Sequence, residues 1–355
     1  MQFENRIMAS VMESSLREIL LDTIERHRRW GIAEQLDYDK FYLYSLVTHS
    51  TAIEGSTVTE LENTLMFDKG ISVKGKSIME QMMNIDLKSA YEMAMAEAKG
   101  HTDFSVEMLR GLSAMVMKNT GAKYSTMAGE FDAAKGDLRL VNVSAGVGGR
   151  SYMNYLKVPA KLEEFCSQIN ERRRGLLESD DIYEKYMLSF DAHFQLVTIH
   201  PWVDGNGRMA RLVMNYIQYE LGVIPSKVGK EDKIEYIQAL IDAREAESLE
   251  PIRRFMLTEH IKNLNEEIRG FEHSENFDPM GTNMIPREAI TDGVERALYD
   301  MICEDGRRTY GEMADRIGVS ESTIKRKLNR LKGGGFIQRK GGNRNGCWVI
   351  VGDKK

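Results

Sequence analysis

The sequence predicts a mainly α-helical protein in which a helical core carries one small β-hairpin and a linker leads to a basic C-terminal module. Three observations lead to this prediction. Long segments place apolar residues at helical spacing, one glycine-rich stretch of β-branched residues interrupts them, and the charge changes sign after an aperiodic segment. The 355 residues are enough for two or three domains.

Composition excludes several classes of protein. Hydrophobic residues make up 42% of the chain, charged residues make up 29%, and the formal net charge is −6, as in an ordinary globular protein. Cys166, Cys303 and Cys347 lie far apart, which excludes a disulfide framework and a thiolate zinc site and fits a reducing compartment. The first residues do not resemble a signal peptide, and no stretch approaches the roughly 20 apolar residues of a membrane span. We therefore expect a cytoplasmic protein without a membrane partner.

The first hundred residues (1–100) are predicted to form an N-terminal helical region. Apolar residues recur at helical spacing over residues 8–29 and, more regularly, over residues 76–98. Methionine is frequent here, and it serves as a flexible core residue with good helix propensity. We interpret these methionines as packing residues.

The pattern changes between residues 125 and 158. Glycines flank a short run that contains β-branched residues, Leu-Arg-Leu-Val-Asn-Val-Ser-Ala over residues 138–145. Such a pattern predicts a hairpin with a glycine-rich tip inside an otherwise helical protein.

The rest of the core, within residues 101–268, returns to helical periodicity. The predicted helices span residues 161–174, 183–200, 207–221, 230–246 and 250–268. Pro201 ends the second of them. Residues 269–286 lose all periodicity and contain two of the six prolines, which predicts an interdomain linker.

Residues 200–211 carry the most chemistry. They run His-Pro-Trp-Val-Asp-Gly-Asn-Gly-Arg-Met-Ala-Arg, a pattern that predicts a helix end, a tight turn and a new helix. The unpaired N–H groups and the dipole of a new helix form an anion site, and Gly205 and Gly207 allow a ligand to approach the backbone. Arg208 and Arg211 share one helix face and can bind neighbouring phosphates.

Two further side chains complete a set for phosphoryl or nucleotidyl transfer. Asp204 offers a hard oxygen ligand for Mg²⁺, and His200 stands where a neutral imidazole could take a proton from an incoming hydroxyl. A histidine at a helix end, an Asp-Gly turn or a pair of solvated arginines is ordinary when it occurs alone. Their conjunction within twelve residues predicts a catalytic site.

This segment resembles the signature of the Fic family, His-x-Phe-x-Asp/Glu-Gly-Asn-Gly-Arg-x-x-Arg, and departs from it only at Trp202, where phenylalanine is usual. Residues 233–240 resemble the Tyr-x-x-Ala-Leu segment that commonly follows, and residues 136–143 resemble the opening of the family's β-hairpin flap. The resemblance covers roughly residues 40–260.

The resemblance implies Mg²⁺-dependent transfer of AMP from ATP to a Ser, Thr or Tyr hydroxyl of a protein, self-modification included. Such transfer depends mostly on positioning and charge stabilisation. The roles implied for the motif residues are a general base at His200, a Mg²⁺ ligand at Asp204, a phosphate cradle at Gly205, Asn206 and Gly207, stabilisation of the developing charge at Arg208, a γ-phosphate contact at Arg211 and a nucleotide contact at Tyr236. The flap residues Leu140, Val141, Asn142 and Val143 would pair with an extended target segment.

An upstream motif, Ser50-Thr51-Ala52-Ile53-Glu54-Gly55, predicts a helix C-terminus with a glycine cap. Beside the Fic signature it also resembles the family's inhibitory motif, in the subclass where that helix lies N-terminal in the same chain. The resemblance implies an autoinhibitory salt bridge between Glu54 and Arg211, with Ser50 in the same motif. The same glutamate could instead assist removal of AMP, and the sequence does not separate the two directions.

Residues 287–355 form a module of different charge. From Met284 to the C-terminus there are 15 basic and 10 acidic residues, a net charge of +5, which leaves −11 for the rest of the chain. Three predicted helices and a hairpin resemble a winged helix-turn-helix, with a recognition helix over residues 322–332 and a wing tip near Arg344. The residues we expect to contact DNA are Thr323, Lys325, Arg326, Lys327, Arg330 and Arg344. The alternative is a protein-docking module of the same shape.

Two other functions remain open at this point. The winged helix could belong to a DNA-binding regulator whose core only senses nucleotide, although the full set of His200, Asp204, Arg208 and Arg211 argues against an inactive sensor. Alternatively, the same enzyme site could use another donor or transfer group, as in phosphocholine or kinase-like transfer. The target protein and the oligomeric state, a homo-oligomer included, are not determined by the sequence.

Overall fold

The predicted helices are present in the structure, a computed structural model that describes residues 2–35, 37–145, 150–272, 292–333, 336–340 and 347–350. The chain divides into two compact units, residues 1–268 and 269–355, and each has its own hydrophobic core. The mainly α-helical fold class is confirmed, since short two-stranded sheets are the only sheets among the described residues.

Five helices make up the N-terminal part: α1 (Gln2–Arg29), α2 (Tyr38–Ile53), α3 (Glu60–Lys69), α4 (Ile78–Lys99) and α5 (Val106–Val116). A short 3₁₀ helix (Ile32–Glu34) lies between α1 and α2. Helices α3 and α4 each begin with a capping box, Thr59 with Glu62 and Ser77 with Glu80, which satisfies backbone N–H groups at both helix starts. Helices α3 and α5 were not predicted from the sequence.

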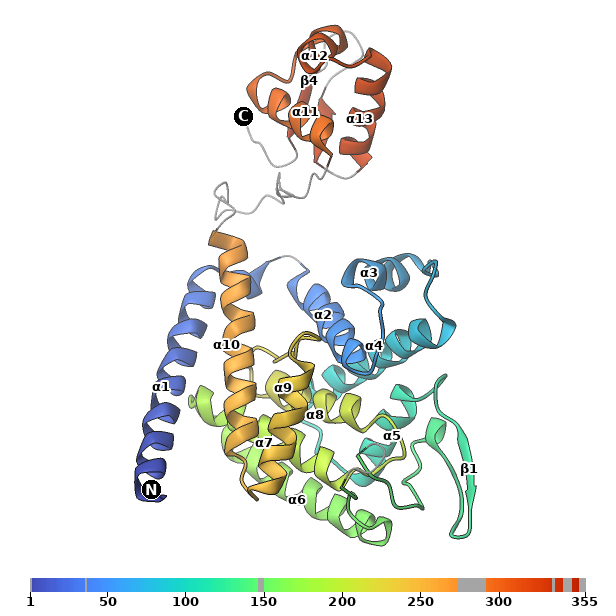
Figure 1. The fold of residues 1–355 in the computed structure, drawn as a ribbon, viewed down its shortest axis with the longest axis vertical. Coiled ribbons are helices and arrows are strands. Elements are labelled where there is room, and N and C mark those ends of the chain that lie inside the picture. Colours follow the sequence, from blue (N-terminus) through green and yellow to red (C-terminus); the bar gives the residue numbers. More distant parts are fainter. Residues whose placement is uncertain are drawn as a thin grey trace. The chain divides into compact units, whose positions relative to one another are not determined.

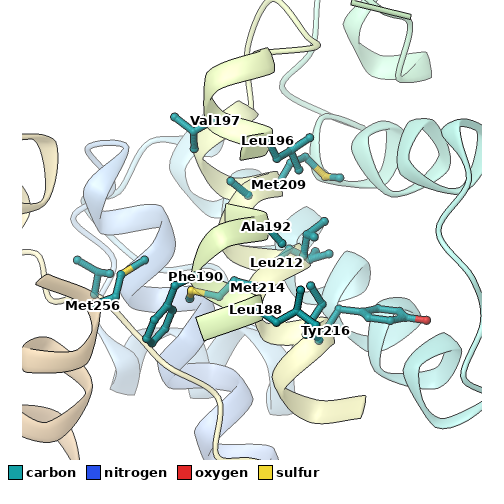
Figure 2. Packing of buried hydrophobic residues seen from close by; sticks show 14 of the residues in the cluster. Leu188, Phe190, Ala192, Leu196, Val197, Met209, Leu212, Met214, Tyr216 and Met256 are labelled. Atoms are coloured by element: carbon teal, nitrogen blue, oxygen red, sulfur yellow. The ribbon is translucent and has the colours of Figure 1, made fainter. Parts of the chain in front are cut away.

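The centre of the first unit is the pair α7 (Ile182–Ile199) and α8 (Asn206–Glu220), with α6 (Val158–Leu176) beside α7. Figure 2 shows how Leu188 and Ala192 of α7 lie against Leu212 and Tyr216 of α8. Both helices are buried around most of their circumference, and buried polar side chains such as His193 of α7 and Asn215 and Gln218 of α8 lie among the apolar ones. The C-terminal end of α7 and the N-terminal end of α8 are joined by the short loop of residues 200–205.

Helix α9 (Lys233–Glu245) and α10 (Glu250–Glu272) as far as residue 268 complete the first unit, and α1 runs alongside α10 (Figure 1). Arg26 donates to Asn265 at 3.1 Å, and His27 Nε2 lies 3.1 Å from Glu267 Oε2. Helix α10 continues past the predicted end at residue 268 as far as Glu272. The remaining residues of the predicted linker, 273–286, lie outside the described residues.

The β-hairpin differs from the prediction. The regular hairpin is β1 (Lys123–Thr126) with β2 (Gly129–Asp132), which lies earlier than the predicted strand run, and Tyr124 stacks on Phe131 across it. It is followed by 3₁₀ turns at Ala133–Lys135 and, later, at Tyr155–Lys157.

Residues 138–153, which we call the flap segment, contain no regular strand among their described residues. Its two arms are joined by one antiparallel bridge, Ser144 with Ser151, and by a bond from the Tyr152 N–H to the Val143 carbonyl at 2.9 Å. The prediction of strands at residues 138–145 is therefore wrong in detail, because only one bridge forms where a ladder was expected. The predicted glycine-rich tip falls on residues 146–149, which lie outside the described residues.

The second unit contains α11 (Gly293–Glu304), α12 (Tyr310–Ile317), α13 (Glu321–Gly333) and an antiparallel pair, β3 (Ile337–Lys340) with β4 (Cys347–Ile350). Its core includes Leu298, Met313, Ile324, Leu328 and Trp348. Three helices followed by a two-stranded sheet is the arrangement predicted for this module.

None of the helices in the described parts of the chain combines the length and the apolar character that crossing a membrane requires.

Candidate functional site

The loop between α7 and α8 is held by its own side chains. His200 ends α7 in a left-handed conformation (φ 52°). The Asn206 amide accepts from the Trp202 N–H at 3.0 Å and donates to the Trp202 carbonyl at 2.9 Å, while the buried Trp202 indole donates to the Gly136 carbonyl at 3.2 Å. Trp202 thus anchors the loop in the core. The Asn206 side chain, expected to cradle phosphate, is instead engaged within the loop.

Gly205 and Gly207 form the N-terminus of α8. Gly205 has φ +78°, and a Cβ there would lie 2.8 Å from Met117 Sδ, so any other residue would be strained and would displace the Met117 side chain. A Cβ at Gly207 would lie 2.6 Å from Glu54 Oε1. The Glu54 carboxylate therefore occupies the space beside the first turn of α8, where the unpaired N–H groups of a helix favour an anion.

Glu54 and Arg211 form the ion pair that the inhibitory motif implies, although they lie 157 residues apart in the sequence. Arg211 Nη2 donates to Glu54 Oε1 at 2.6 Å, and the exposed side-chain fractions are 4% for Arg211 and 34% for Glu54. Ser50 supplies two further acceptors, since Arg211 Nε donates to Ser50 Oγ at 2.9 Å and Nη2 donates to its carbonyl at 3.0 Å.

The pKa values of this pair agree with a charged contact. Burial acts to raise the pKa of Glu54, but the Arg211 guanidinium, with smaller help from Arg208 and Lys233, makes the net shift downward. Burial acts to lower the pKa of Arg211, but Glu54 raises it overall. Both groups are therefore ionised near neutral pH.

A buried polar network holds the end of α2 that carries Glu54. Thr51 Oγ1 donates to Asn84 Oδ1 at 2.8 Å, Asn63 Nδ2 donates to the same oxygen at 2.9 Å, and Asn84 Nδ2 donates to Ser56 Oγ at 3.1 Å. All four side chains are buried. Thr51 belongs to the predicted inhibitory motif, but Ser56, Asn63 and Asn84 were not predicted, because positions on a loop and on two further helices carry no shared spacing.

Arg208 is buried under the same loop. Its Nη2 lies 3.1 Å from Met117 Sδ and 3.7 Å from Asp204 Oδ2, and its Nη1 donates to the Val116 carbonyl at 3.4 Å. Its Nε has no hydrogen-bond partner among the described residues. Burial lowers the pKa of Arg208, and nearby Asp204 and Glu54 act in the opposite direction. A buried guanidinium with an N–H that lacks a hydrogen-bond partner is suited to binding a ligand anion.

His200 is oriented by contacts on its edge and on its face. Its Nδ1 lies 3.2 Å from the Val197 carbonyl, so the proton is assigned to Nδ1 and Nε2 is free to accept. Tyr152 of the flap segment stacks on the imidazole, with ring centroids 3.7 Å apart and planes at 16°. Burial lowers the pKa of His200 to about 4, and Arg139 and Arg244 act in the same direction. The imidazole is neutral at pH 7, as a general base must be.

Asp204 is the one candidate metal ligand brought to this site. Its carboxylate is 65% exposed, and one oxygen accepts from the Gly205 N–H at 2.6 Å. The described residues contain no cluster of three or more metal-ligating side chains.

The remaining predicted residues of the first unit lie around this centre. Tyr236 interacts with Arg211, but its side chain is buried and its hydroxyl lies 2.8 Å from His193 Nε2. In this structure it supports the arginine from within the core. Of the flap residues Leu140–Val143, Asn142 is exposed and the others are partly buried, and the Asn142 Oδ1 accepts from the Tyr155 N–H at 3.0 Å.

The predicted DNA-contacting residues of α13 divide into two groups. Lys325, Arg326 and Arg330 are exposed, and Thr323 is partly buried near the start of the helix. Lys327 differs from the prediction, because it is only 7% exposed and pairs with Asp292 and, at 3.1 Å, with Glu295. Lys327 therefore takes part in ion pairs inside the second unit. Arg344 lies outside the described residues.

Comparisons with known proteins agree with this geometry. Residues 103–218 match the Fic/DOC family, and residues 291–338 match the winged helix-turn-helix DNA-binding family. Residues 103–218 therefore resemble a Fic/DOC domain and residues 291–338 resemble a winged helix-turn-helix domain, as expected from the sequence.

Relatives named as protein adenylyltransferases resemble part of the chain. Protein adenylyltransferase fic-1 of Caenorhabditis elegans is 27% identical over 204 residues, which are 57% of this chain and 36% of the relative. Protein adenylyltransferase Fic of Nematostella vectensis is 28% identical over 213 residues, 59% of this chain and 45% of the relative. The chain thus spans less than half the length of these relatives.

Solved structures share the fold. Fic-1 (residues 134–508) from C. elegans has a TM-score of 0.58 at 21% identity, covering 75% of this chain and 76% of that one. A Fic family protein from Desulfovibrio desulfuricans G20 has a TM-score of 0.53 at 16% identity, covering 95% and 97% of the two chains.

Proposed function

We propose that this protein is an autoinhibited protein adenylyltransferase, which transfers AMP from ATP to Ser, Thr or Tyr hydroxyls of a protein, itself included. The observation that carries the proposal is the convergence of a neutral imidazole, a helix N-terminus and two buried arginines at one loop. The adenylyltransferase names of the partial relatives support the same reaction.

In the proposed reaction the hydroxyl oxygen of the target forms a bond to the α-phosphorus of ATP. The bond between this phosphorus and the oxygen bridging to the β-phosphate breaks, and pyrophosphate leaves. The hydroxyl proton passes to Nε2 of His200, which is available because Nδ1 is bonded to the Val197 carbonyl. With a pKa of about 4, His200 is unprotonated at neutral pH and ready to accept it.

The phosphates would bind at the start of α8. The first N–H groups of α8, at Asn206 and Gly207, would bind phosphate once the Glu54 carboxylate has left the space beside Gly207. The Gly205 N–H already donates to Asp204, so it joins the cradle only if that bond opens. The unpartnered Nε of Arg208 supports a role in stabilising the developing charge. Arg211 would contact the γ-phosphate once Glu54 has moved, and Tyr236 supports Arg211 from the core.

Mg²⁺ dependence is part of the proposal, and Asp204 is the residue that would hold the ion. A single exposed carboxylate fits Mg²⁺, which commonly takes one or two carboxylates and completes its shell with phosphate oxygens and water. When bound, the ion supplies neutralisation of phosphate charge.

Autoinhibition follows from the place of the Glu54 carboxylate. The carboxylate lies beside Gly207 and accepts a hydrogen bond from the Arg211 guanidinium, so it competes with a terminal phosphate for that guanidinium. Removal of AMP, or use of another donor, would employ the same groups and is distinguished by the product. We also propose that the flap residues Leu140–Val143 pair with an extended segment of the target. The protein is further proposed to act in the cytoplasm, where its free cysteines stay reduced.

Intact-mass measurement after incubation with Mg²⁺ and ATP tests the proposal. The Glu54→Gly variant should gain about 329 Da, the mass of AMP esterified with loss of pyrophosphate, and the double variant with His200→Ala should gain nothing. A phosphate-sized gain would instead establish kinase-like transfer. No gain with Glu54→Gly, with or without an added acceptor protein, would refute the transferase.

The exposed cations of α13 support a second function, DNA binding by the winged helix. Lys325, Arg326 and Arg330 lie on the helix that occupies the recognition position of this fold. Titration of the protein with duplex DNA at several salt concentrations tests it. A steep loss of affinity with salt is expected, and a slope near zero would favour the protein-docking alternative.

A further inference from the structure

Tyr152 links the flap segment to the catalytic loop through its ring. It follows Ser151, which bridges to Ser144, and its N–H donates to the Val143 carbonyl at 2.9 Å, so its backbone belongs to the paired arms of the flap segment. Its ring stacks on His200 at 3.7 Å, and the Arg244 guanidinium of α9 lies over the same ring, 4.7 Å from its centroid. Tyr152 therefore contacts both the base and a helix of the core.

The two contacts of the His200 ring restrain different motions. The Nδ1 contact to the Val197 carbonyl holds one edge of the ring, and the Tyr152 stack holds its plane. The lone pair of Nε2 lies in the ring plane, so a partner on the face leaves it open at the edge. Together the contacts set the direction from which a hydroxyl proton can be accepted.

Arg139 secures the backbone of the same region. Its side chain is 1% exposed, and it donates to the carbonyls of His200 at 2.7 Å, of Val141 at 2.6 Å and of Met153. Its own N–H donates to the Pro201 carbonyl at 3.0 Å. One buried guanidinium thus joins the base to both arms of the flap segment.

We propose that Tyr152 is a positioning residue that aims His200 Nε2 at a hydroxyl presented along the flap segment, and that Arg244 holds Tyr152 in place. This inference rests on the proposed transferase function. It means that the surface that would dock the target and the group that removes the proton are oriented as one unit. A hydroxyl carried on an extended segment along residues 140–143 is then preferred over one that approaches the face of the imidazole, which Tyr152 covers.

A spectroscopic measurement tests the stack without reference to activity. Histidine ring protons stacked under a tyrosine shift upfield, so the His200 signal, assigned with His200→Ala, should lie upfield in the wild-type protein and in Tyr152→Phe. It should return toward the position of an exposed histidine in Tyr152→Ala. A His200 signal that is the same in all three proteins would overturn the proposed contact.

Kinetics in the Glu54→Gly background test the positioning role. Tyr152→Ala should lower kcat of AMP transfer at least tenfold with the KM for ATP unchanged, and Tyr152→Phe should restore the rate, since the ring and not the hydroxyl makes the contact. Arg244→Ala should give a smaller loss of the same kind. Tyr219→Ala is the matched control, because it removes another partly buried ring under a cation, Lys99, at 5.9 Å.

The outcomes separate this inference from the function on which it rests. If the Glu54→Gly parent transfers AMP and Tyr152→Ala matches its kcat, the positioning role is wrong and the transferase stands. If the parent itself transfers nothing, the transferase fails and the positioning role fails with it. A KM for ATP that rises with an unchanged kcat would assign Tyr152 to nucleotide binding and also overturn the proposal.

Discussion

Replacing Glu54 by glycine should strengthen binding of ATP more than binding of ADP. Only ATP carries the γ-phosphate, and in the structure the Glu54 carboxylate occupies the Arg211 donor that this phosphate would need, at 2.6 Å. Loss of the carboxylate frees that donor. It also removes a negative charge from the space beside Gly207.

The size of the effect follows from the contact. A hydrogen bond between charged groups contributes about 1.5–3 kcal/mol, and we take the lower end because Glu54 is 34% exposed. About 1.5 kcal/mol corresponds to roughly a tenfold change in an equilibrium constant. The ratio of the ADP Kd to the ATP Kd should therefore rise about tenfold in Glu54→Gly.

Calorimetric titration with ATP and with ADP measures this ratio, with His200→Ala present in every protein to prevent turnover. Glu54→Gln is a matched variant that keeps a hydrogen-bond acceptor and loses the charge, so it should give an intermediate ratio. Ser50→Ala keeps the ion pair and should change the ratio little. An unchanged ratio in a folded Glu54→Gly protein, judged by its thermal midpoint, would refute the competition between Glu54 and the γ-phosphate.

Three further predictions concern stability and DNA binding. Burial lowers the pKa values of His193 and His260 to about 3 in the folded protein. Between pH 6.5 and pH 3 these histidines are therefore protonated in the unfolded chain but not in the folded one. Stability in urea should then fall as the pH drops, by about 2 kcal/mol per histidine at pH 5, and a flat profile would contradict this. Trp202→Ala should cost about 3–5 kcal/mol in the same assay, because the indole is 1% exposed. Lys325→Ala should reduce the salt slope of DNA binding by about 1. Lys327→Ala should instead lower the thermal midpoint of the second unit, because it breaks the internal ion pairs. If both variants changed the salt slope and the thermal midpoint equally, the division of the α13 cations into exposed and internal residues would be wrong.

Much of the helical fold could be predicted from the sequence. Helix α4 shows the reason, since Ser77 and Glu80 form its capping box and apolar residues follow at helical spacing. The β1–β2 hairpin could not be placed in this way, because its strands are four residues long and its one strong cross-strand signal is the pair Tyr124 and Phe131. The run at residues 138–145 has a better strand composition, yet only a single bridge forms there.

The candidate site was predictable where its residues are adjacent in sequence. His200, Asp204 and Arg208 meet because one turn and one helix start place them together. Arg139, Tyr152 and Arg244 were not predicted as site residues, since they lie on the flap segment and on α9, far from His200 in the sequence. A sequence-level signal exists only for Arg139, an arginine inside an otherwise apolar run.

The sequence by itself determined the local chemistry: which helices form, where an anion could bind a helix start, and which base and carboxylate stand beside it. Only the tertiary structure decided how these groups are used. In the folded chain Glu54 forms an ion pair with Arg211, the Asn206 amide is hydrogen-bonded to the backbone of Trp202, and Lys327 is buried in an ion pair with Glu295. The physical reason is that backbone periodicity and capping act over a few residues, whereas contacts between distant side chains depend on how whole helices pack.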